Sequence, residues 1–167
     1  MARVPQNGRN FEYLSGEDPY LGKPMVKAVV NGIQSKGKAE RGTERNSGIM
    51  ATAKHWVNNN QETNRMTVSA NVSTRVEKEM YFVPFEGAIE ARAGSFMCSY
   101  NRINGTWSCE NDFTLNQQLK KELGFNGFVM SDWWATHSLS LMQGLDQEQP
   151  DSMFINETSV TAMVQNG

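Results

Sequence analysis

The sequence contains no long hydrophobic run. Its longest apolar stretches, Met80 to Phe85 and Phe128 to Met130, are far shorter than the roughly 20 residues that cross a bilayer, so we expect no membrane-spanning segment. The first ten residues, MARVPQNGRN, also lack the apolar region of a secretory signal. If the parent protein is secreted or extracellular, we expect its signal to lie upstream of this chain.

The sequence also has no strong excess of charge, because 16 lysines and arginines are balanced by 18 aspartates and glutamates. It therefore lacks the basic patch that nucleic-acid or anionic-membrane binding requires, and we expect neither partner. No Gly-rich GxGxxG or GxxxxGK turn is present, which disfavours the phosphate-binding α/β folds. A chain of 167 residues allows one hydrophobic core and is short for a two-domain enzyme.

Cysteine is scarce, since Cys98 and Cys109 are the only two. The turn signal Asn104-Gly105 between them could bring them together in a disulfide, but two free, buried thiols fit the spacing as well. Three Asn-X-Ser/Thr triplets permit glycosylation if the chain enters a secretory pathway. They begin at Asn71, Asn104 and Asn156.

The apolar pattern predicts helices that alternate with short buried strands, which is typical of an α/β fold with a parallel sheet. A first helix is expected to begin at Pro24 and to end near Gly37, and a second to begin with the capping pair Thr74 and Glu77. Further helices are expected at 111–124 and 136–144, the latter with Leu139 and Met142 inward, and strands at 49–53, 95–99 and 127–131. Residues 38–47 are predicted as an exposed insertion or loop.

Polar and aromatic residues follow each expected strand, namely Lys54-His55-Trp56, Tyr100-Asn101 and Asp132-Trp133-Trp134. Because the carboxyl ends of parallel strands form one rim, we expect these side chains to share an opening. A carboxylate there can attack a carbon centre, while basic side chains bind hydroxyl groups and keep the carboxylate ionised. Two plainer interpretations remain: Asp132 could cap a following helix, and Lys54-His55 could be a surface pair.

Five colinear motifs resemble glycoside hydrolase family 3, which contains many β-glucosidases. GFVMSDW at 127–133 resembles the nucleophile signature, and the others are GRNFE at 8–12 with 15–19, AKHW at 53–56, GSFMCSYN at 94–101 and GLD at 144–146. The resemblance implies a partial (β/α)8 TIM-type barrel at 1–150 that lacks the early strands. Residues 151–167 would then be a polar tail that could be disordered.

The resemblance also implies specific residue roles, with Asp132 as the catalytic nucleophile. The implied substrate-binding residues are Arg9, Lys54, His55, Arg65, Met97, Tyr100 and Trp133. Tyr100 would lie beside Asp132, and Trp133 would line the glucose subsite. From the residues alone, a core methionine is the favoured interpretation of Met97, and a solvated side chain is the usual case for an arginine such as Arg65.

These roles imply a retaining β-glucosidase that releases glucose from β-glucosides or cello-oligosaccharides by double displacement, with two carboxyl groups about 5 Å apart. In the resembled family the general acid belongs to a C-terminal domain, so we expect a missing C-terminal part of the parent protein to supply it. No metal or cofactor is implied.

The run Lys54-His-Trp-Val-Asn differs from the Lys-His-Phe-Pro-Gly of the N-acetylglucosaminidase branch, which favours the glucosidase branch. The alternative hypothesis is a truncated, non-catalytic sugar-binding fragment, and a weaker one is an α/β site for another small ligand.

Overall fold

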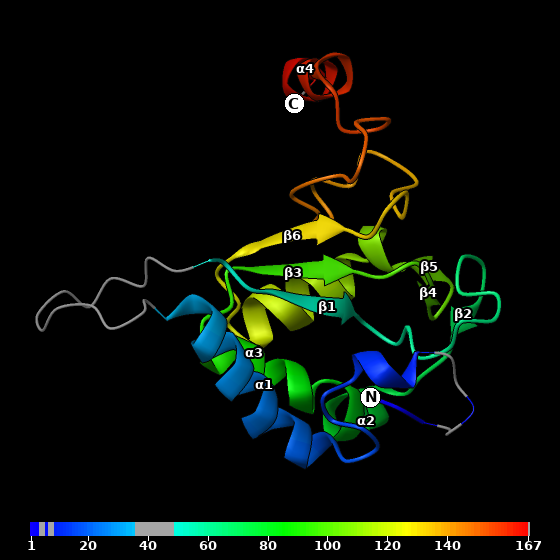
Figure 1. The fold of residues 1–167 in the computed structure, drawn as a ribbon. Coiled ribbons are helices and arrows are strands. Elements are labelled where there is room, and N and C mark those ends of the chain that lie inside the picture. Colours follow the sequence, from blue (N-terminus) through cyan, green and yellow to red (C-terminus); the bar gives the residue numbers. More distant parts are fainter. Residues whose placement is uncertain (4–5, 7–8, 36–48, 167) are drawn as a thin grey trace, which may run out of the picture.

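A parallel three-stranded sheet forms the centre of the fold (Figure 1). The computed structural model describes residues 1–3, 6, 9–35 and 49–166. Strands β1 (Thr52–Trp56), β3 (Ser95–Cys98) and β6 (Phe128–Ser131) lie in the order β1-β3-β6 and run in the same direction. The α/β class predicted from the sequence is therefore confirmed. The first helix ends at Gln34, shortly before the expected Gly37, whereas the expected insertion at 38–47 lies outside the described residues.

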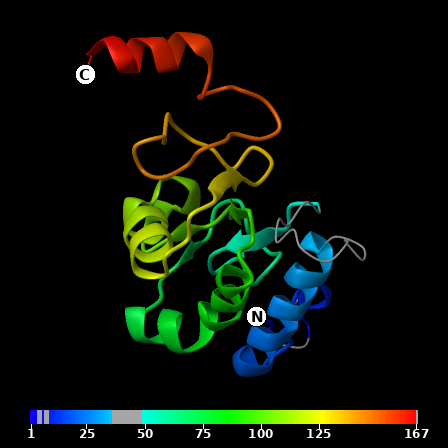
Figure 2. The ribbon, with the colours of Figure 1, turned by 90° about the vertical axis from the view of Figure 1, so that its left-hand side faces the viewer.

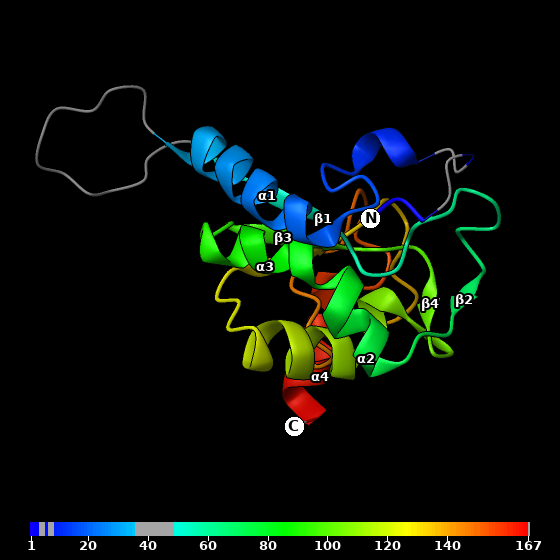
Figure 3. The same cartoon turned by 90° about the horizontal axis from the view of Figure 1, so that it is seen from below.

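Helices cover one face of this sheet. Figures 1 and 3 show α1 (Pro19–Gln34), α3 (Val83–Glu90) and the wide helix η4 (Phe113–Glu122) side by side on that face. The shorter helices are η1 (Asn10–Glu12), α2 (Thr74–Val76), η2 (Glu77–Tyr81) and η3 (Ser108–Glu110). In the described part of the chain, no helix has the length and apolar character needed to cross a membrane.

An aromatic cluster fills the space between the sheet and the helices. The ring of Trp56 stacks on Phe82 at a centroid distance of 4.7 Å and meets Phe85 edge-on at 5.1 Å. Phe96 lies 5.9 Å from Trp56 and 4.5 Å from Phe125. Because each such ring removes a large apolar area from water, this cluster fixes which face of the strands is buried.

A second, smaller sheet lies beside the carboxyl ends of the central strands. It contains β2 (Ser69–Ala70), β4 (Arg102–Ile103) and β5 (Thr106–Trp107), with β2 parallel and β5 antiparallel to β4. The turn between β4 and β5 is Asn104-Gly105, where φ is 48° and 93°. The predicted turn is present because asparagine and glycine tolerate positive φ, but strands of two residues left no periodic signal.

Two helix starts differ from the sequence prediction. Helix α1 begins at Pro19, because Asp18 accepts hydrogen bonds from the backbone N–H groups of Tyr20 and Leu21, and Pro24 lies within the helix. Helix α2 is capped by Ser73, whose hydroxyl accepts from the N–H of Val76, and not by Thr74. In both cases a capping side chain lies upstream of the predicted start of the helix.

The first strand extends further than predicted. Residues Lys54, His55 and Trp56 belong to β1 and do not follow it, while Ile49 and Met50 precede it and are exposed. Pairing with β3 continues because a bulge between Lys54 and Trp56 keeps Trp56 in the aromatic core.

The helix predicted at 136–144 is wrong. This segment forms turns, and the expected inward Met142 is 71% exposed. The chain instead returns along β6, where the N–H of Ser131 donates to the carbonyl of Gln147 and the N–H of Trp134 to that of Gln149. The turns at 140–145 reverse the chain, so that the residues after them can pair with β6.

The polar tail contains a helix. Where composition suggested that 151–167 could be disordered, the structure contains α4 (Glu157–Asn166), which stands away from the sheet in Figures 1 and 2 and buries none of its residues. Asn156 begins it, because its side-chain oxygen accepts from the N–H of Ser159. The boundary near 150 between a barrel domain and a tail stays a prediction.

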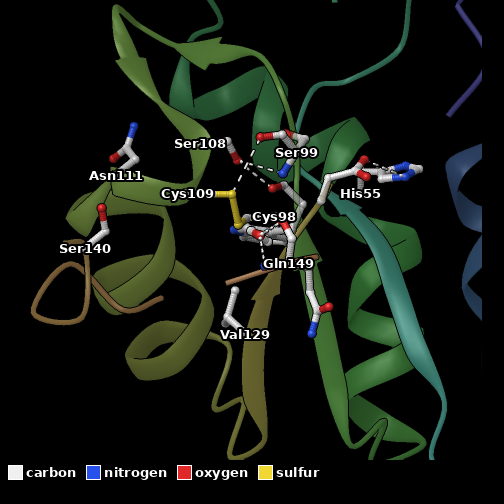
Figure 4. Close-up of a disulfide and its surroundings, with 12 residues drawn as sticks. His55, Cys98, Ser99, Ser108, Cys109, Asn111, Val129, Ser140 and Gln149 are labelled. Carbon is white, nitrogen blue, oxygen red and sulfur yellow. Dashed lines mark hydrogen bonds and ion pairs between the residues drawn. A yellow bond between two sulfur atoms is a disulfide. The ribbon is translucent and has the colours of Figure 1, made fainter. Parts of the chain in front are cut away.

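A disulfide links the end of β3 to helix η3. Cys98 and Cys109 are joined, with their Cα atoms 5.3 Å apart, and both are fully buried. Figure 4 shows the bond among Ser99 and Ser108, where the Ser108 hydroxyl donates to the carbonyl of Trp56 at 2.6 Å. The structure therefore contains the bonded pair and not the two free thiols.

Replacing both cysteines by alanine is expected to lower the free energy of unfolding by about 2–4 kcal/mol, because the unfolded chain then regains the freedom that the cross-link removes. Denaturant unfolding of the purified chain measures the change. As a control, a thiol reductant should destabilise the original chain and leave the double variant unaffected. Equal stability of the two proteins would contradict the prediction.

Candidate active site

Side chains from the three central strands meet at one edge of the sheet. His55 lies in β1, Tyr100 follows β3, and Asp132 follows β6. Nε2 of His55 is 3.2 Å from Oδ2 of Asp132, and the Tyr100 hydroxyl hydrogen-bonds to the same carboxylate. All three are buried, with 6–8% of each residue exposed. Parallel, in-register strands thus bring together the cluster that the sequence predicted.

The backbone fixes Asp132 from two directions. Its N–H donates to the carbonyl of Cys98 at 3.1 Å, and its Oδ1 accepts from the N–H of Trp133 at 2.8 Å. Because 136–144 forms turns, the carboxylate caps no helix there. The plainer interpretation of Asp132 as a helix cap is therefore wrong.

Two arginines approach the cluster from neighbouring loops and share one carboxylate. Glu62 lies 2.9 Å from Nη1 of Arg9 and 3.3 Å from Nε of Arg65. The guanidinium of Arg65 lies over the ring of Tyr100, 4.7 Å from its centroid, so Arg65 is not simply a solvated side chain. Glu62 was not predicted, because it lies in a polar stretch without periodicity or motif.

The remaining predicted residues lie at the rim of the cluster. Lys54 is exposed and pairs in register with the half-buried Met97, on the sheet face opposite to Phe96. Trp133 contacts Asp132 through its backbone, and the residue is 44% exposed. These three residues offer a cation, a thioether and an indole to an incoming ligand, and their roles stay predictions.

Burial and charge keep both partners of Asp132 neutral. Burial, then the cations Lys54, Arg9 and Arg65, lower the pKa of His55 to about 3, despite the nearby carboxylate. Burial, then Asp132, raise the pKa of Tyr100 to about 12. A neutral His55 with its hydrogen on Nε2 and a protonated Tyr100 can therefore both donate to the carboxylate.

The arrangement is suited to nucleophilic attack by a carboxylate. Asp132 is accessible over only 8% of its surface, and two donors hold it in place. Within the described ranges, no group of three or more His, Cys, Asp or Glu residues could hold a metal ion. A fixed carboxylate near the cations Lys54, Arg9 and Arg65 has the features needed for covalent catalysis at a carbon centre.

The pKa of His55 predicts its titration. His55 and His137 are the only two histidines, and burial lowers the pKa of His137 as well. In an NMR titration, we expect the ring signals of His55 to stay unchanged as the pH falls, until it approaches about 3. Movement of the His55 signals near pH 6.5, the ordinary value, would contradict the assigned burial.

The same shift predicts a stability change with pH. His55 binds a proton near pH 6.5 in the unfolded chain, but only at about pH 3 in the folded chain. The free energy of unfolding that depends on neutral His55 is therefore present in full above pH 6.5, and it decreases as the pH falls towards 3. Thermal unfolding of the chain and of His55→Gln across this window isolates the effect. The variant should show the shallower pH dependence, and equal slopes would refute the contribution.

Comparison with known proteins supplies independent information. The glycosyl hydrolase family 3 N terminal domain matches residues 1–154. The chain is 43% identical over 158 residues to a protein named probable beta-glucosidase L of Neosartorya fischeri, covering 93% of this chain and 20% of that protein. It is 44% identical over 156 residues to beta-glucosidase cel3A of Pyricularia oryzae, covering 92% and 20%. The chain thus spans a fifth of the length of these relatives.

Solved structures show the same fold. DesR, a β-glucosidase from Streptomyces venezuelae in complex with D-glucose, superposes with a TM-score of 0.86 at 39% identity, over 99% of this chain and 22% of that one. A β-glucosidase from Bifidobacterium adolescentis gives a TM-score of 0.87 at 40% identity, over 100% and 23%. Sequence and structure therefore point to the same group of proteins.

Proposed function

Because this chain belongs to glycosyl hydrolase family 3, we propose that the protein carrying it is a retaining β-glucosidase with Asp132 as the nucleophile. The observation that supports this most is the contact of Asp132 with His55 and Tyr100 in a buried cluster at the strand ends. The family, the relatives' names and the D-glucose in the DesR structure favour a glucosyl substrate.

The proposed reaction has two displacements. Asp132 attacks the anomeric carbon as the glycosidic C–O bond breaks, and the leaving oxygen takes a proton from a general acid. Water then attacks the glycosyl-enzyme, gives its proton to the same group, and releases the Asp132 carboxylate. The acid stands about 5 Å from the nucleophile in retaining enzymes, and we propose that a C-terminal domain of the full-length protein supplies it.

The chain's own residues would orient the sugar. Donation from neutral His55 and Tyr100 keeps the carboxylate in one position while leaving it free of a tight ion pair. Lys54 and the arginines would bind hydroxyl groups, and the exposed indole of Trp133 would pack on the apolar face of the ring. Met97 would line the same opening from the neighbouring strand. No cofactor enters this scheme.

We further propose that the sheet is part of a (β/α)8 barrel. Among the described residues, β1 pairs only with β3, so its other edge is open. A cavity of about 210 Å³ beside β1 is lined by apolar side chains of α1, including Val26, Val29 and Ile33. An additional strand would supply hydrogen-bond partners for the unpaired backbone groups of β1, and its side chains would fill this cavity.

The buried disulfide supports an extracellular location for the protein. Disulfides persist in oxidising compartments and are rare in the cytosol. Cys98 and Cys109 are bonded to each other, and both are inaccessible to solvent. We therefore propose that the full-length protein passes through a secretory pathway.

Labelling tests the nucleophile directly. A 2-fluoro-glucoside should trap a glycosyl-enzyme on the full-length protein, and peptide mass spectrometry should find the label on Asp132. Asp132→Asn should lower kcat for an aryl β-glucoside by about 10⁴-fold or more, since the attacking group is lost. Label on another carboxylate would overturn the assignment.

A matched control variant distinguishes inactivation by loss of the nucleophile from inactivation by unfolding. Asp146 is an exposed aspartate near the same strand, paired with Lys120 on the helix side. Asp146→Asn should keep most of the turnover, because its amide oxygen can still accept from the N–H of Val129 and only the ion pair with Lys120 is lost. Comparable inactivation of both variants would indicate unfolding and not loss of the nucleophile.

A further inference from the structure

Two neighbouring indoles lie exposed directly after Asp132. The chain leaves the carboxyl end of β6 in a turn, in which the N–H of Ala135 donates to the carbonyl of Asp132 at 3.1 Å (Figure 1). Trp133 and Trp134 are the two central residues of this turn, and they are 44% and 55% exposed. Because tryptophan is largely buried in most proteins, two exposed indoles beside a buried carboxylate need a physical reason.

The backbone of Trp134 has a conformation that does not suit tryptophan. Its φ is 60°, in the left-handed region that residues with a side chain rarely adopt. The third position of a turn with positive φ favours glycine, which would form the same turn without strain. The turn therefore does not require an indole, and a strained conformation kept beside an active site suggests a function for the side chain.

Hydrogen bonds hold the indole of Trp134 by its edge. The backbone N–H of Trp134 donates to the carbonyl of Gln149 at 2.9 Å, and its Nε1–H donates to Oδ2 of Asp151 at 2.9 Å. The loop that carries Asp151 is closed by Glu148, whose carboxylate accepts from the backbone N–H groups of 154–155 at 2.9 and 2.7 Å. An indole that is held through its nitrogen is fixed in orientation, while its ring faces stay open.

Trp107, in the neighbouring small sheet, shows the opposite arrangement. The guanidinium of Arg102 lies 4.1 Å from the centre of its ring, and the ring of His137 stacks on it at 4.0 Å. Two groups this close to one ring centre cannot share a face, so both faces of Trp107 are occupied. Across the ranges that the structure describes, neither a ring nor a cation stacks on Trp134 in this way.

The open faces of Trp134 lie on the side from which a leaving group would depart. His55, Tyr100 and Asp132 are buried, so a glucosyl unit bound by them would occupy the inner part of the site. The group on the other side of the glycosidic bond must then extend outwards, where Trp133 and Trp134 are exposed. Trp133 is assigned to the glucosyl ring under the proposed function, which leaves Trp134 for the group beyond it.

We propose that Trp134 is a specificity-determining residue that stacks on the ring of the leaving group, which in a natural oligosaccharide is the second sugar. The flat apolar face of the indole is complementary to the C–H groups on one face of a sugar ring. Trp134 takes no part in bond making or breaking, so it changes the affinity for the leaving group and not the attack by Asp132. This inference rests on the proposed glucosidase function.

Steady-state kinetics of the full-length protein test the proposal with two substrates. Cellobiose has a sugar ring as its leaving group, whereas methyl β-glucoside carries the same glucosyl unit without such a ring. Trp134→Gly should raise KM for cellobiose by about 2–10-fold, the size expected for one ring stack, and leave kcat nearly unchanged. Both constants for methyl β-glucoside should stay nearly the same.

The kinetic outcomes separate this inference from the proposed function. Equal changes for the two substrates in Trp134→Gly, or no change for either, would overturn the role of Trp134. Failure of the unmodified full-length protein to hydrolyse either glucoside would overturn the proposed function, and this inference with it.

Two further variants supply the controls. Trp134→Phe keeps a flat ring and should restore most of the affinity for cellobiose. Trp107→Leu removes an indole whose faces are already occupied, so any change in KM should be the same for both substrates. A change limited to cellobiose in Trp107→Leu would overturn the assignment to Trp134.

Thermal unfolding distinguishes a ligand platform from a packing contact. Because glycine relieves the positive φ, the unfolding midpoint of full-length Trp134→Gly should not decrease. A lower midpoint would show that the indole packs against another part of the full-length protein, and it would overturn the proposal.

Discussion

The in-register pairing of three parallel strands is the constraint on which the candidate site depends. The register places Trp56, Cys98 and Ser131 opposite one another, so the following residues leave the sheet at the same edge. Because side chains alternate along a strand, a slip by one residue would turn the site residues to the other face. The fully buried Phe96, packed between Trp56 and Phe125, opposes such a slip. Packing on one face therefore determines the chemistry at the edge.

Charge is arranged around the site so that the groups touching Asp132 are neutral. With pKa values of about 3 and about 12, His55 and Tyr100 both carry no charge over the range between them. The cations stand further out, and Glu62 ties Arg9 to Arg65. A protonated histidine would hold the Asp132 carboxylate in an ion pair, whereas a neutral donor orients it without that charge.

The sequence predicted the parts of the fold that local patterns control. Strands β3 and β6 were found because short apolar runs end at turn signals, and the site cluster followed from their polar ends. The true extent of β1 was missed because it depends on a bulge and on the burial of Trp56, which are tertiary effects. The helix predicted at 136–144 is absent because this segment forms turns that lead into residues 146–149, which bond to β6 and the residues after it. Glu62 left no signal because its partners are distant in the chain.

The loop that carries Tyr100 is anchored at its base and at its tip. At the base, the disulfide and the Ser108 hydroxyl hold the loop against β1 and β3, and Cys98 also binds the N–H of Asp132 (Figure 4). At the tip, Asn104 binds Val72 across the small sheet. The hydrogen bonds of Asn104 therefore help to hold the loop that places Tyr100 beside the carboxylate.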